Sequence, residues 1–560
     1  MTRIVIVGGV AGGASAAARA RRMSEDAEII MIDRGPYISF ANCGLPYHIG
    51  GDIQSRDALL LQTPESFKRR FNVDVRLHTE AVAIDRETKQ LQVRDTQTDA
   101  TDTLSYDTLI LSPGAAPFVP SIANIDDSRI QTLRNIPDMD RILRELEQQQ
   151  PTHATVVGGG FIGLEAAEAM RQRGLDVSLV ELSSQVMAPV DPEMATPLHK
   201  ELEDHGVDLR LNAGLTEIEP QQDKLTLTLS DGAKLDTGLV VLAIGVRPET
   251  ALAKSAGLAV AERGGIQVDS QMRTNDPDIL AVGDAVEIVE WVTDKAKLIP
   301  LAGPANRQGR IAADNAVGKQ RHFGKTQGTA VCRVFGLTVA STGMNEKQLT
   351  QADIKFRKVY VHPMDHASYF PGAAQISLKL LFCPDSGKIY GAQAVGAKGV
   401  DKRIDVLAVA QRAGMTVFDL EELELCYAPP YGSAKDPVNL AGFVAANEIR
   451  GEADLLYPEQ LTSIQSHQQL LDVRTPAELE RVGQFDGAIN ISVDELRDRL
   501  GELDKETEYW VTCQVGLRGH VAYRMLVNSG FKAKNLTGGF KSWQMWKGCR
   551  QPQPIVTEGE

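Results

Sequence analysis

The sequence predicts an α/β protein built from several domains. A glycine-rich turn between an apolar strand and a helix occurs near the N-terminus and again after Thr155. An alternating apolar pattern covers residues 326–450, and a third strand–turn–helix pattern begins at Leu470. At 560 residues the chain is too long for one hydrophobic core, so we expect these patterns to belong to separate domains.

Composition argues against several classes of protein. The net charge of −15 disfavours nucleic-acid binding through bulk charge. The six cysteines are scattered without a CxxC pair, so we expect no zinc or other metal site and no secreted disulfide framework. Apolar runs are strand-length and the N-terminal residues enter a strand at once, so no membrane span and no signal peptide are predicted. A reducing cytoplasm is the expected location.

The first βαβ unit spans residues 4–33. The apolar run Ile4–Val7 predicts a strand, residues 8–13 a glycine-rich turn and Ala14–Met23 a helix, before a second strand that ends at Asp33. Such a turn lets the backbone approach a pyrophosphate, which the N–H groups and dipole of the helix N-terminus favour. Val10 replaces the middle glycine of the GxGxxG fingerprint, so an ordinary α/β turn remains an alternative for this stretch.

The second βαβ unit, residues 155–181, satisfies the same fingerprint in full. Gly158, Gly160 and Gly163 take the three glycine positions. Glu181 ends the next strand, where a carboxylate suits the 2′-hydroxyl of NADH and repels the 2′-phosphate of NADPH. Two dinucleotide sites predict a flavin and a nicotinamide cofactor as the economical pair. A structural repeat without a ligand is the alternative.

Two other features point to chemistry near the first unit. The apolar strand at residues 279–282 ends in Gly283 and Asp284, which places a carboxylate at the sheet edge where ligands collect. Cys43 follows the first unit closely and has no second cysteine nearby. A thiol in this position can reach a flavin ring, and its disulfide or persulfide must form with a molecule from outside the chain.

Together these motifs resemble the flavoprotein disulfide reductases with two dinucleotide-binding domains, over roughly residues 1–450. The resemblance implies a discontinuous Rossmann-like FAD domain, an inserted Rossmann-like NAD domain and an α+β dimerisation domain. The residues that it implies for FAD are Gly8, Gly12, Gly13, Asp33 and Asp284, and those for NADH are Gly158, Gly160, Gly163 and Glu181.

The C-terminal pattern resembles a single α/β rhodanese domain. Its CxxGxR loop, residues 513–518, follows a strand and precedes a helix, and Asp472-Val473-Arg474 lies upstream. Such a loop curls backbone N–H groups around one thiolate, and the resemblance implies Cys513 and Arg518 as catalytic residues. A structural cysteine in a decayed domain is the alternative.

The expected boundaries follow from both resemblances. They are 1–113 for the first part of the FAD domain, 114–147 for its return segment, 148–265 for the NAD domain, 266–325 for the second part of the FAD domain, 326–450 for the dimerisation domain, 451–458 for a linker and 459–550 for the rhodanese domain.

The stretch from Ser39 to Tyr47, with its single cysteine, resembles the coenzyme A disulfide reductase branch, which includes persulfide and polysulfide reductases fused to rhodanese. The resemblance implies a homodimer in which Tyr369 and Tyr427 of one subunit donate a proton at the other subunit's Cys43. The implied coenzyme A contacts are Ser15, Arg19, Arg22, Ser39 and Asn42.

The sequence therefore predicts an FAD-dependent NADH oxidoreductase that reduces coenzyme A persulfide, polysulfide or coenzyme A disulfide through Cys43. Coenzyme A is either a substrate or a bound carrier, and Cys513 takes sulfane sulfur from a polysulfide or a thiosulfate-like donor. Two alternatives stay open. One is an NADH oxidase or peroxidase in which Cys43 cycles through sulfenic acid, and the other is a redox or sulfur sensor without turnover.

Overall fold

The structure, a computed structural model, describes residues 2–549 and divides them into two compact units. One unit holds the described residues up to Val180 together with Ala213–Gly328. The other holds Glu181–Asn212 together with the described residues from Thr329 onward. Across the described residues, no helix is both long enough and apolar enough to cross a membrane.

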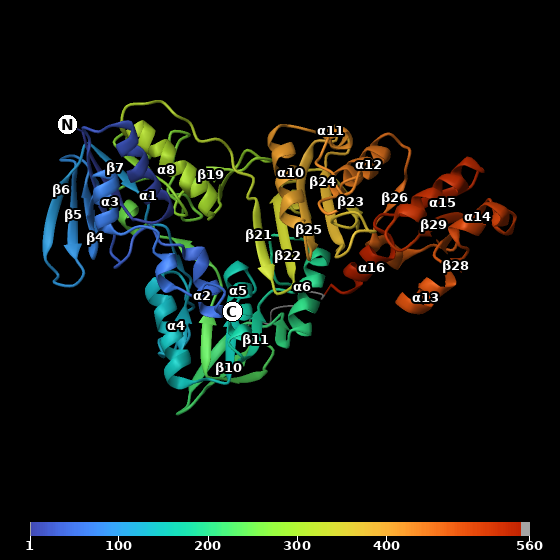
Figure 1. Cartoon of the computed structure of the whole chain (residues 1–560), viewed down its shortest axis with the longest axis horizontal. Coiled ribbons are helices and arrows are strands. Elements are labelled where there is room, and N and C mark those ends of the chain that lie inside the picture. Colours follow the sequence, from blue (N-terminus) through green and yellow to red (C-terminus); the bar gives the residue numbers. More distant parts are fainter. Residues whose placement is uncertain (1, 550–560) are drawn as a thin grey trace. The chain divides into compact units, whose positions relative to one another are not determined.

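The first unit contains a five-stranded parallel sheet in the order β18-β7-β1-β2-β3, whose strand β7 is labelled in Figure 1. Because β18 pairs with β7, a segment far along the chain completes the sheet that the N-terminal residues begin. This confirms the discontinuous Rossmann-like domain. The strands are β1 (Arg3–Val7), β2 (Glu28–Ile32), β3 (Asp74–Arg76), β7 (Thr108–Leu111) and β18 (Ile279–Ala281).

Helix α1 (Ala11–Met23) follows β1 and crosses α8 (Ala302–Ala316) at close range. Glycines make this crossing possible, because a Cβ on Gly309 would lie 2.2 Å from the carbonyl oxygen of Gly12. Gly309 therefore allows α8 to approach the backbone of α1, while a Cβ on Gly12 would lie 2.7 Å from Ser112 Oγ, so Gly12 also has a packing role in addition to the cofactor role expected from the sequence.

A second set of parallel strands, in the order β11-β10-β16-β9, repeats the plan. Helix α5 (Phe161–Gln172) follows β10, and α4 (Ile136–Gln149) follows β9. The second Rossmann-like domain is thereby confirmed. Its strands are β9 (Ile130–Thr132), β10 (His153–Val157), β11 (Asp176–Glu181) and β16 (Leu239–Leu242).

Smaller elements complete this unit. One antiparallel sheet consists of β4 (Thr79–Asp85), β5 (Gln90–Asp95) and β6 (Thr101–Ser105), and another of β13 (Leu215–Pro220), β14 (Leu225–Leu229) and β15 (Lys234–Thr237). Two strand pairs are β8 (Ala115–Pro117) with β17 (Val246–Pro248) and β19 (Glu287–Val289) with β20 (Ala296–Leu298). The helices are α2 (Leu45–Gly50), α3 (Pro64–Phe71) and α7 (Ala251–Ser255).

The second unit contains an antiparallel sheet in the order β21-β22-β25-β24-β23. Its strand β24 is buried along its whole length, since α10 (Val400–Arg412) and α12 (Pro437–Ile449) pack on the sheet. The strands are β21 (Ala330–Val334), β22 (Leu337–Gly343), β23 (Arg357–Val361), β24 (Ile376–Phe382) and β25 (Ile389–Gly396), and two further helices are α9 (Glu346–Gln351) and α11 (Val417–Glu422). Residues 181–212 of this unit form α6 (Pro192–Asp204) and β12 (Val207–Leu211).

The C-terminal part of this unit is a parallel sheet in the order β26-β30-β29-β27-β28. The α/β character expected here is confirmed. Its elements are β26 (Leu455–Leu456), β27 (Gln468–Asp472), β28 (Ile489–Asn490), β29 (Glu508–Thr512), β30 (Lys532–Leu536), α13 (Pro476–Val482), α14 (Val493–Arg499), α15 (Leu517–Asn528) and α16 (Gly539–Lys547).

The expected linker at 451–458 is wrong in its second half. Leu455 and Leu456 form β26, which pairs with Asn535 and Leu536 of β30. Both leucines are buried, because an edge strand of this sheet offers them an apolar surface that a free linker would not. One continuous hydrophobic core joins this sheet to the antiparallel sheet, so the C-terminal domain is packed against its neighbour.

Candidate active site

The two glycine-rich turns share one backbone construction. Gly8 and Gly158 have φ of +95° and +110°, which only glycine adopts without strain. A Cβ on Gly13 would lie 1.8 Å from the Gly8 carbonyl oxygen, and a Cβ on Gly163 would lie 1.8 Å from the Gly158 carbonyl oxygen. The turns therefore correspond position by position.

The departure at Val10 has a structural explanation. Val10 precedes α1 with φ of −102°, a conformation open to β-branched residues. At the corresponding position Gly160 has φ of −80°, and a Cβ there would meet nothing within 4 Å. This position is uncrowded by the protein, so a glycine is needed there only where a ligand comes close.

Asp33 fixes the end of the first turn. Its Oδ2 accepts a hydrogen bond from the Gly9 N–H at 2.8 Å, and its Oδ1 accepts one from the Gly35 N–H at 2.8 Å. Burial raises the pKa of this carboxyl, and the two backbone hydrogen bonds oppose the rise. Each oxygen keeps a lone pair, so the carboxylate can also accept a bond from a ribose hydroxyl.

Asp284 presents a second carboxylate just after β18. The preceding Gly283, with φ of +85°, donates its N–H to Gln308 Oε1 at 2.7 Å. Burial raises the pKa of Asp284, and within residues 2–549 its half-buried carboxylate has no hydrogen-bond or ion-pair partner. An acceptor of this kind at the carboxyl edge of a parallel sheet suits a hydroxyl-rich ligand, and FAD fits that description.

Cys43 lies in a short 3₁₀ turn, Asn42–Gly44, directly before α2. Its N–H donates to Asn42 Oδ1 at 3.1 Å, and its Sγ is 3.7 Å from the same oxygen. The residue has an exposed surface, but partial shielding of the thiol from water raises its pKa, and the charges of Glu165 and Asp284 raise it further. The thiol thus lies within electrostatic reach of both dinucleotide-binding sheets, and these protein groups disfavour the thiolate.

Three residues expected to contact coenzyme A lie on α1. Arg19 forms a bidentate pair with Asp314 at 2.8 and 3.0 Å, and the Ser15 hydroxyl donates to Asn306 Oδ1 at 2.5 Å. Arg22 is exposed and has no ion-pair partner among residues 2–549. Of the two arginines, Arg22 is therefore the one with a guanidinium available for a phosphate.

The other two expected contacts, Ser39 and Asn42, lie on the segment that leads to Cys43. Ser39 has φ of +45° and donates its N–H to the Gly9 carbonyl oxygen at 2.7 Å. This bond ties the cysteine-bearing segment to the first glycine-rich turn.

Glu181, expected to face the NADH ribose, ends β11. Its Oε1 accepts hydrogen bonds from the N–H and the hydroxyl of Ser183, at 2.8 and 2.7 Å. The carboxylate is thus held in a fixed orientation at the end of the strand.

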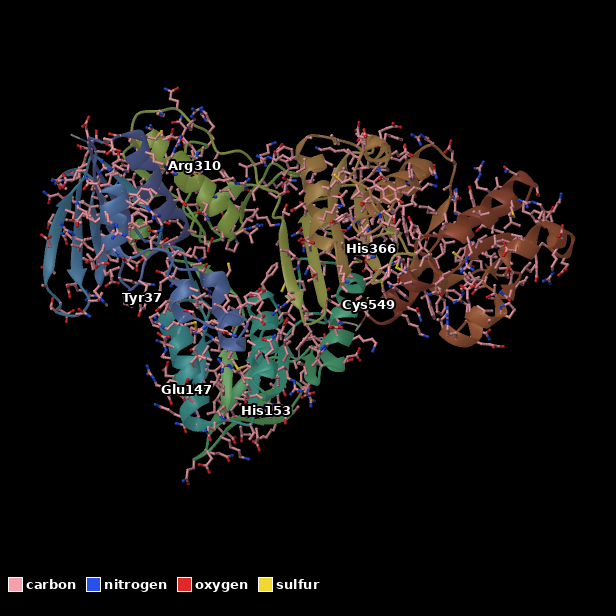
Figure 2. All side chains as sticks on the ribbon, in the orientation of Figure 1. Tyr37, Glu147, His153, Arg310, His366 and Cys549 are labelled. Carbon is pink, nitrogen blue, oxygen red and sulfur yellow. The ribbon has the colours of Figure 1, made fainter. Side chains whose placement is uncertain are left out.

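Tyr369 and Tyr427, both expected to act at the other subunit's Cys43, form a hydrogen-bonded pair. Their hydroxyl oxygens are 3.1 Å apart, and the residues are 74% and 50% exposed. The hydrogen bond with Tyr427 raises the pKa of Tyr369. His366, labelled in Figure 2, lies on the same loop as Tyr369, and its Nδ1 is 2.8 Å from Asp365 Oδ2. The pair places two hydroxyl groups on an exposed surface of the second unit.

Cys513 is fully buried in a cradle of backbone groups after β29. The Gly516 N–H donates to its Sγ at 3.2 Å, and Gly516 has φ of +95° where α15 begins. Arg518 donates to both carboxylate oxygens of Glu478, at 2.8 and 2.6 Å, which lowers the pKa of Glu478 to about 2. The sequence analysis missed Glu478, although the spacing from Thr475 to Glu478 is that of a capping box at the start of α13.

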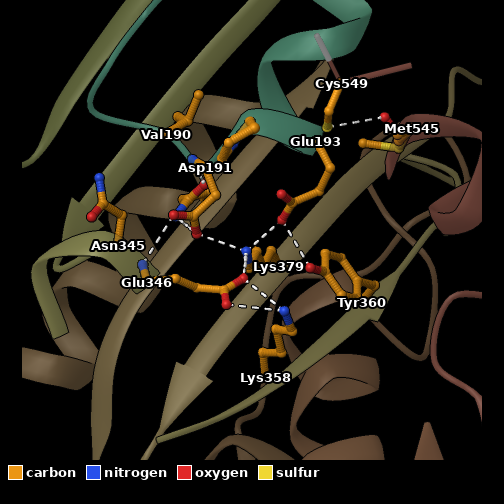
Figure 3. Close-up of polar contacts among 12 residues, drawn as sticks. Val190, Asp191, Glu193, Asn345, Glu346, Lys358, Tyr360, Lys379, Met545 and Cys549 are labelled. Carbon is orange, nitrogen blue, oxygen red and sulfur yellow. Dashed lines mark hydrogen bonds and ion pairs between the residues drawn. The ribbon is translucent and has the colours of Figure 1, made fainter. Parts of the chain in front are cut away.

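A buried cluster of charges lies between α6, α9 and the antiparallel sheet (Figure 3). The carboxylates of Asp191, Glu193 and Glu346 have oxygens within 4.8 Å of one another, a spacing that would suit a cation. The ammonium of Lys379 takes that place, since it donates to Asp191 at 2.7 Å and also to Glu193 and Glu346. Sequence reasoning missed this cluster because its members are distant along the chain.

Comparison with known protein families accounts for nearly the whole chain. The family model described as pyridine nucleotide-disulphide oxidoreductase matches residues 2–309, and the model for the dimerisation domain of that family matches residues 329–436. A rhodanese-like domain model matches residues 457–545.

Individual proteins agree with these matches. A coenzyme A disulfide reductase from Staphylococcus haemolyticus is 36% identical over 80% of this chain and 99% of its own length. The solved structure of reduced Bacillus anthracis CoADR-RHD is 50% identical, with a TM-score of 0.95, over 97% of this chain and 98% of that one. The structure of an NAD-dependent persulfide reductase from A. fulgidus is 37% identical, with a TM-score of 0.91, over 97% of this chain and 100% of that one.

Proposed function

The chain belongs to the pyridine nucleotide-disulphide oxidoreductase family, an enzyme family that uses FAD and NAD(H), and from that premise we propose that it reduces a persulfide or disulfide of coenzyme A at Cys43. The observation that carries this proposal is the position of the Cys43 thiol. It is exposed, it is within reach of the charges of Glu165 and Asp284, and all three belong to the unit that holds both glycine-rich turns.

Each group has a role in the proposed reaction. The two glycine-rich turns, Asp33 and Asp284 would hold FAD and NADH, and bound FAD supplies the two-electron chemistry that connects NADH to a thiol. The Cys43 thiolate attacks one sulfur of the acceptor and forms a mixed disulfide, while the other sulfur leaves as a thiolate. Two electrons from NADH then break the S–S bond of the mixed disulfide, which regenerates the Cys43 thiolate and releases the attached sulfur group as a second thiolate or as sulfide.

The leaving thiolate needs a proton, and the Tyr369–Tyr427 pair is the proposed donor. In a homodimer, which the match to a dimerisation domain supports, each subunit would supply this pair to the other subunit's Cys43. Arg22 is the proposed contact for a coenzyme A phosphate, because its guanidinium has no ion-pair partner among residues 2–549. Small-molecule disulfides and polysulfide are further proposed acceptors, and a reducing cytoplasm remains the predicted location.

Anaerobic NADH oxidation, measured side by side with coenzyme A disulfide, coenzyme A persulfide and polysulfide, tests the proposal. We expect turnover and stoichiometric release of thiol or sulfide. Cys43→Ser should lower this turnover by about 10³-fold or more, since it removes the attacking nucleophile. Cys426→Ser, which changes another exposed cysteine, is the matched control and should keep turnover.

Two results would contradict the proposal. One is full sulfur-dependent turnover by the Cys43→Ser variant. The other is rapid NADH oxidation in air to peroxide or water together with no turnover on any sulfur acceptor, which would favour the oxidase or peroxidase alternative. Negligible NADH turnover under all conditions would favour a sensor.

A further inference from the structure

The loop that surrounds Cys513 presents mostly uncharged side chains to an incoming sulfur donor. Its side chains are those of Gln514, Val515, Leu517 and Arg518, and Leu517 is 68% exposed. The positive electrostatic potential at the sulfur comes from the Gly516 N–H and from the N-terminus of α15, a helix of 12 residues. The loop therefore stabilises charge on the cysteine sulfur itself.

The one cation of the loop is already neutralised. Arg518 lies within electrostatic range of Cys513, but two of its N–H groups are used by Glu478 in a bidentate pair. Because the pKa of Glu478 is lowered to about 2, its carboxylate stays ionised at any pH suitable for an assay. An incoming anion would have to compete with this carboxylate for the guanidinium.

Two other cations adjoin the loop, and each has its own partner. Arg474 is fully buried, pairs with Asp472 at 2.6 Å and donates to Gln514 Oε1 at 3.2 Å. Lys541 donates its N–H to the Gln514 carbonyl oxygen, its ammonium donates to Gln375 Oε1, and burial lowers its pKa.

We propose that Cys513 loads its sulfur from thiol persulfides and discriminates against sulfonate-bearing donors such as thiosulfate, with Glu478 as the residue that sets this preference. The inference rests on the proposed role of Cys513 as a carrier of sulfane sulfur. It disfavours the thiosulfate-like donor, which is one of the two that the sequence leaves open, and names thiol persulfides as the donor class.

The loading step needs no further reactant. The Cys513 thiolate attacks the outer sulfur of R–S–SH, a new S–S bond forms to Cys513, the S–S bond of the donor breaks, and the inner sulfur leaves as the thiolate R–S⁻. Thiosulfate would instead release sulfite, and its sulfonate oxygens would need charge-assisted hydrogen bonds from Arg518, whose positive charge Glu478 already neutralises. A persulfide has no sulfonate group attached to its reacting sulfurs, and its organic arm can pack on the exposed Leu517.

The test uses the full-length holoenzyme without NADH. Glutathione persulfide and thiosulfate are supplied separately, and the rate of persulfide formation at residue 513 is measured by rapid quench and peptide mass spectrometry. We expect loading from glutathione persulfide to be at least about tenfold faster in the unmodified protein, the size of one charge-assisted hydrogen bond. Glu478→Gln should raise the thiosulfate-to-persulfide ratio by about tenfold, because it frees Arg518.

Glu480→Gln is the matched control, since Glu480 is an exposed carboxylate on the same helix, and it should leave the ratio unchanged. Equal loading from both donors in the unmodified protein would overturn the proposal. So would equal ratios in the Glu478→Gln and Glu480→Gln variants, or thiosulfate loading that depends on Lys541 and is lost in Lys541→Gln.

This measurement is independent of the reductase reaction. Cys43→Ser should still load sulfur at Cys513 with the same donor ratio. If NADH turnover does not depend on Cys43, the proposed function is contradicted, but the donor ratio can still be interpreted. A donor ratio of one would contradict only the inference about Glu478.

Discussion

Tyr369 and Tyr427 share a hydrogen bond of 3.1 Å on an exposed loop surface, an arrangement that suits proton donation better than packing. The double variant with phenylalanine at both positions should slow acceptor reduction by roughly 10²- to 10⁴-fold, the range for loss of a general acid. Stopped-flow absorbance should show unchanged flavin reduction by NADH and slowed reoxidation by the sulfur acceptor. Tyr431→Phe, at a neighbouring tyrosine that is 72% exposed, is the control. Equal reoxidation rates in the double variant and the unmodified protein would remove the pair from the reaction.

Charges near Cys43 predict a pH effect. Glu165 raises the pKa of the Cys43 thiol, so Glu165→Gln should lower that pKa and increase the thiolate fraction at neutral pH. The pH profile of iodoacetamide alkylation at residue 43, followed by peptide mass spectrometry, should move to lower pH by roughly half a unit. Glu147→Gln, an exposed change on α4, should leave the profile in place. A shift to higher pH, or none, would contradict the electrostatic role of Glu165.

The site residues that could be predicted from the sequence are those that lie in a short, continuous motif. Cys43 and Cys513 each lie in a recognisable short stretch. Tyr369 and Tyr427 were each expected at the other subunit's active site, and the structure pairs their hydroxyl groups. Glu478 and Lys379 were missed because their partners, Arg518 and the three carboxylates around Lys379, are brought close only by folding.

Different glycines of a glycine-rich turn serve different purposes: some allow the helix to pack on the strand, and others leave room for a ligand. Gly163→Ala should cost about 1–3 kcal/mol of unfolding free energy, because its Cβ would lie 1.8 Å from the Gly158 carbonyl oxygen. Gly160→Ala should change stability by less than about 0.5 kcal/mol and raise the KM for NADH, since its Cβ would enter open space that we propose NADH occupies. Thermal unfolding and NADH titrations measure both effects. Similar loss of stability in the two variants would contradict this division.

Strands and helices were predictable where the apolar period was clear. The expected strand at 4–7 is β1 (Arg3–Val7), and the expected helix at 14–23 is α1, which begins three residues earlier. The short strand β26 could not be predicted, because two leucines carry no period and their burial depends on the edge of a sheet formed 80 residues later.

Lys379 holds three elements of the second unit together. It is fully buried, and its ammonium is shared among carboxylates from α6, from the residue preceding α6 and from α9. Lys379→Met should destabilise the protein by about 3–5 kcal/mol, since it leaves buried carboxylates without a counter-charge. Lys388→Met changes an exposed lysine and should stay within about 0.5 kcal/mol. Equal unfolding midpoints in urea for the two variants would contradict the role of the cluster.

Domain types were thus predictable from the sequence, whereas the contacts between them were not. The continuous core under the antiparallel and C-terminal sheets joins residues from Ala340 to Ala533, and the charge cluster adds α6, which belongs to the same unit. Neither contact has a local pattern, because each depends on residues that meet only in the folded unit.

The edge strand β26 has a practical consequence for dissecting this protein. A fragment begun at residue 459, where a boundary drawn from motif similarity would fall, lacks Leu455 and Leu456 and uncovers the backbone donors and acceptors of β30. Bare strand edges recruit other chains. Self-association of such a fragment would reflect where it was cut, and a sulfurtransferase assay on it would describe an aggregate.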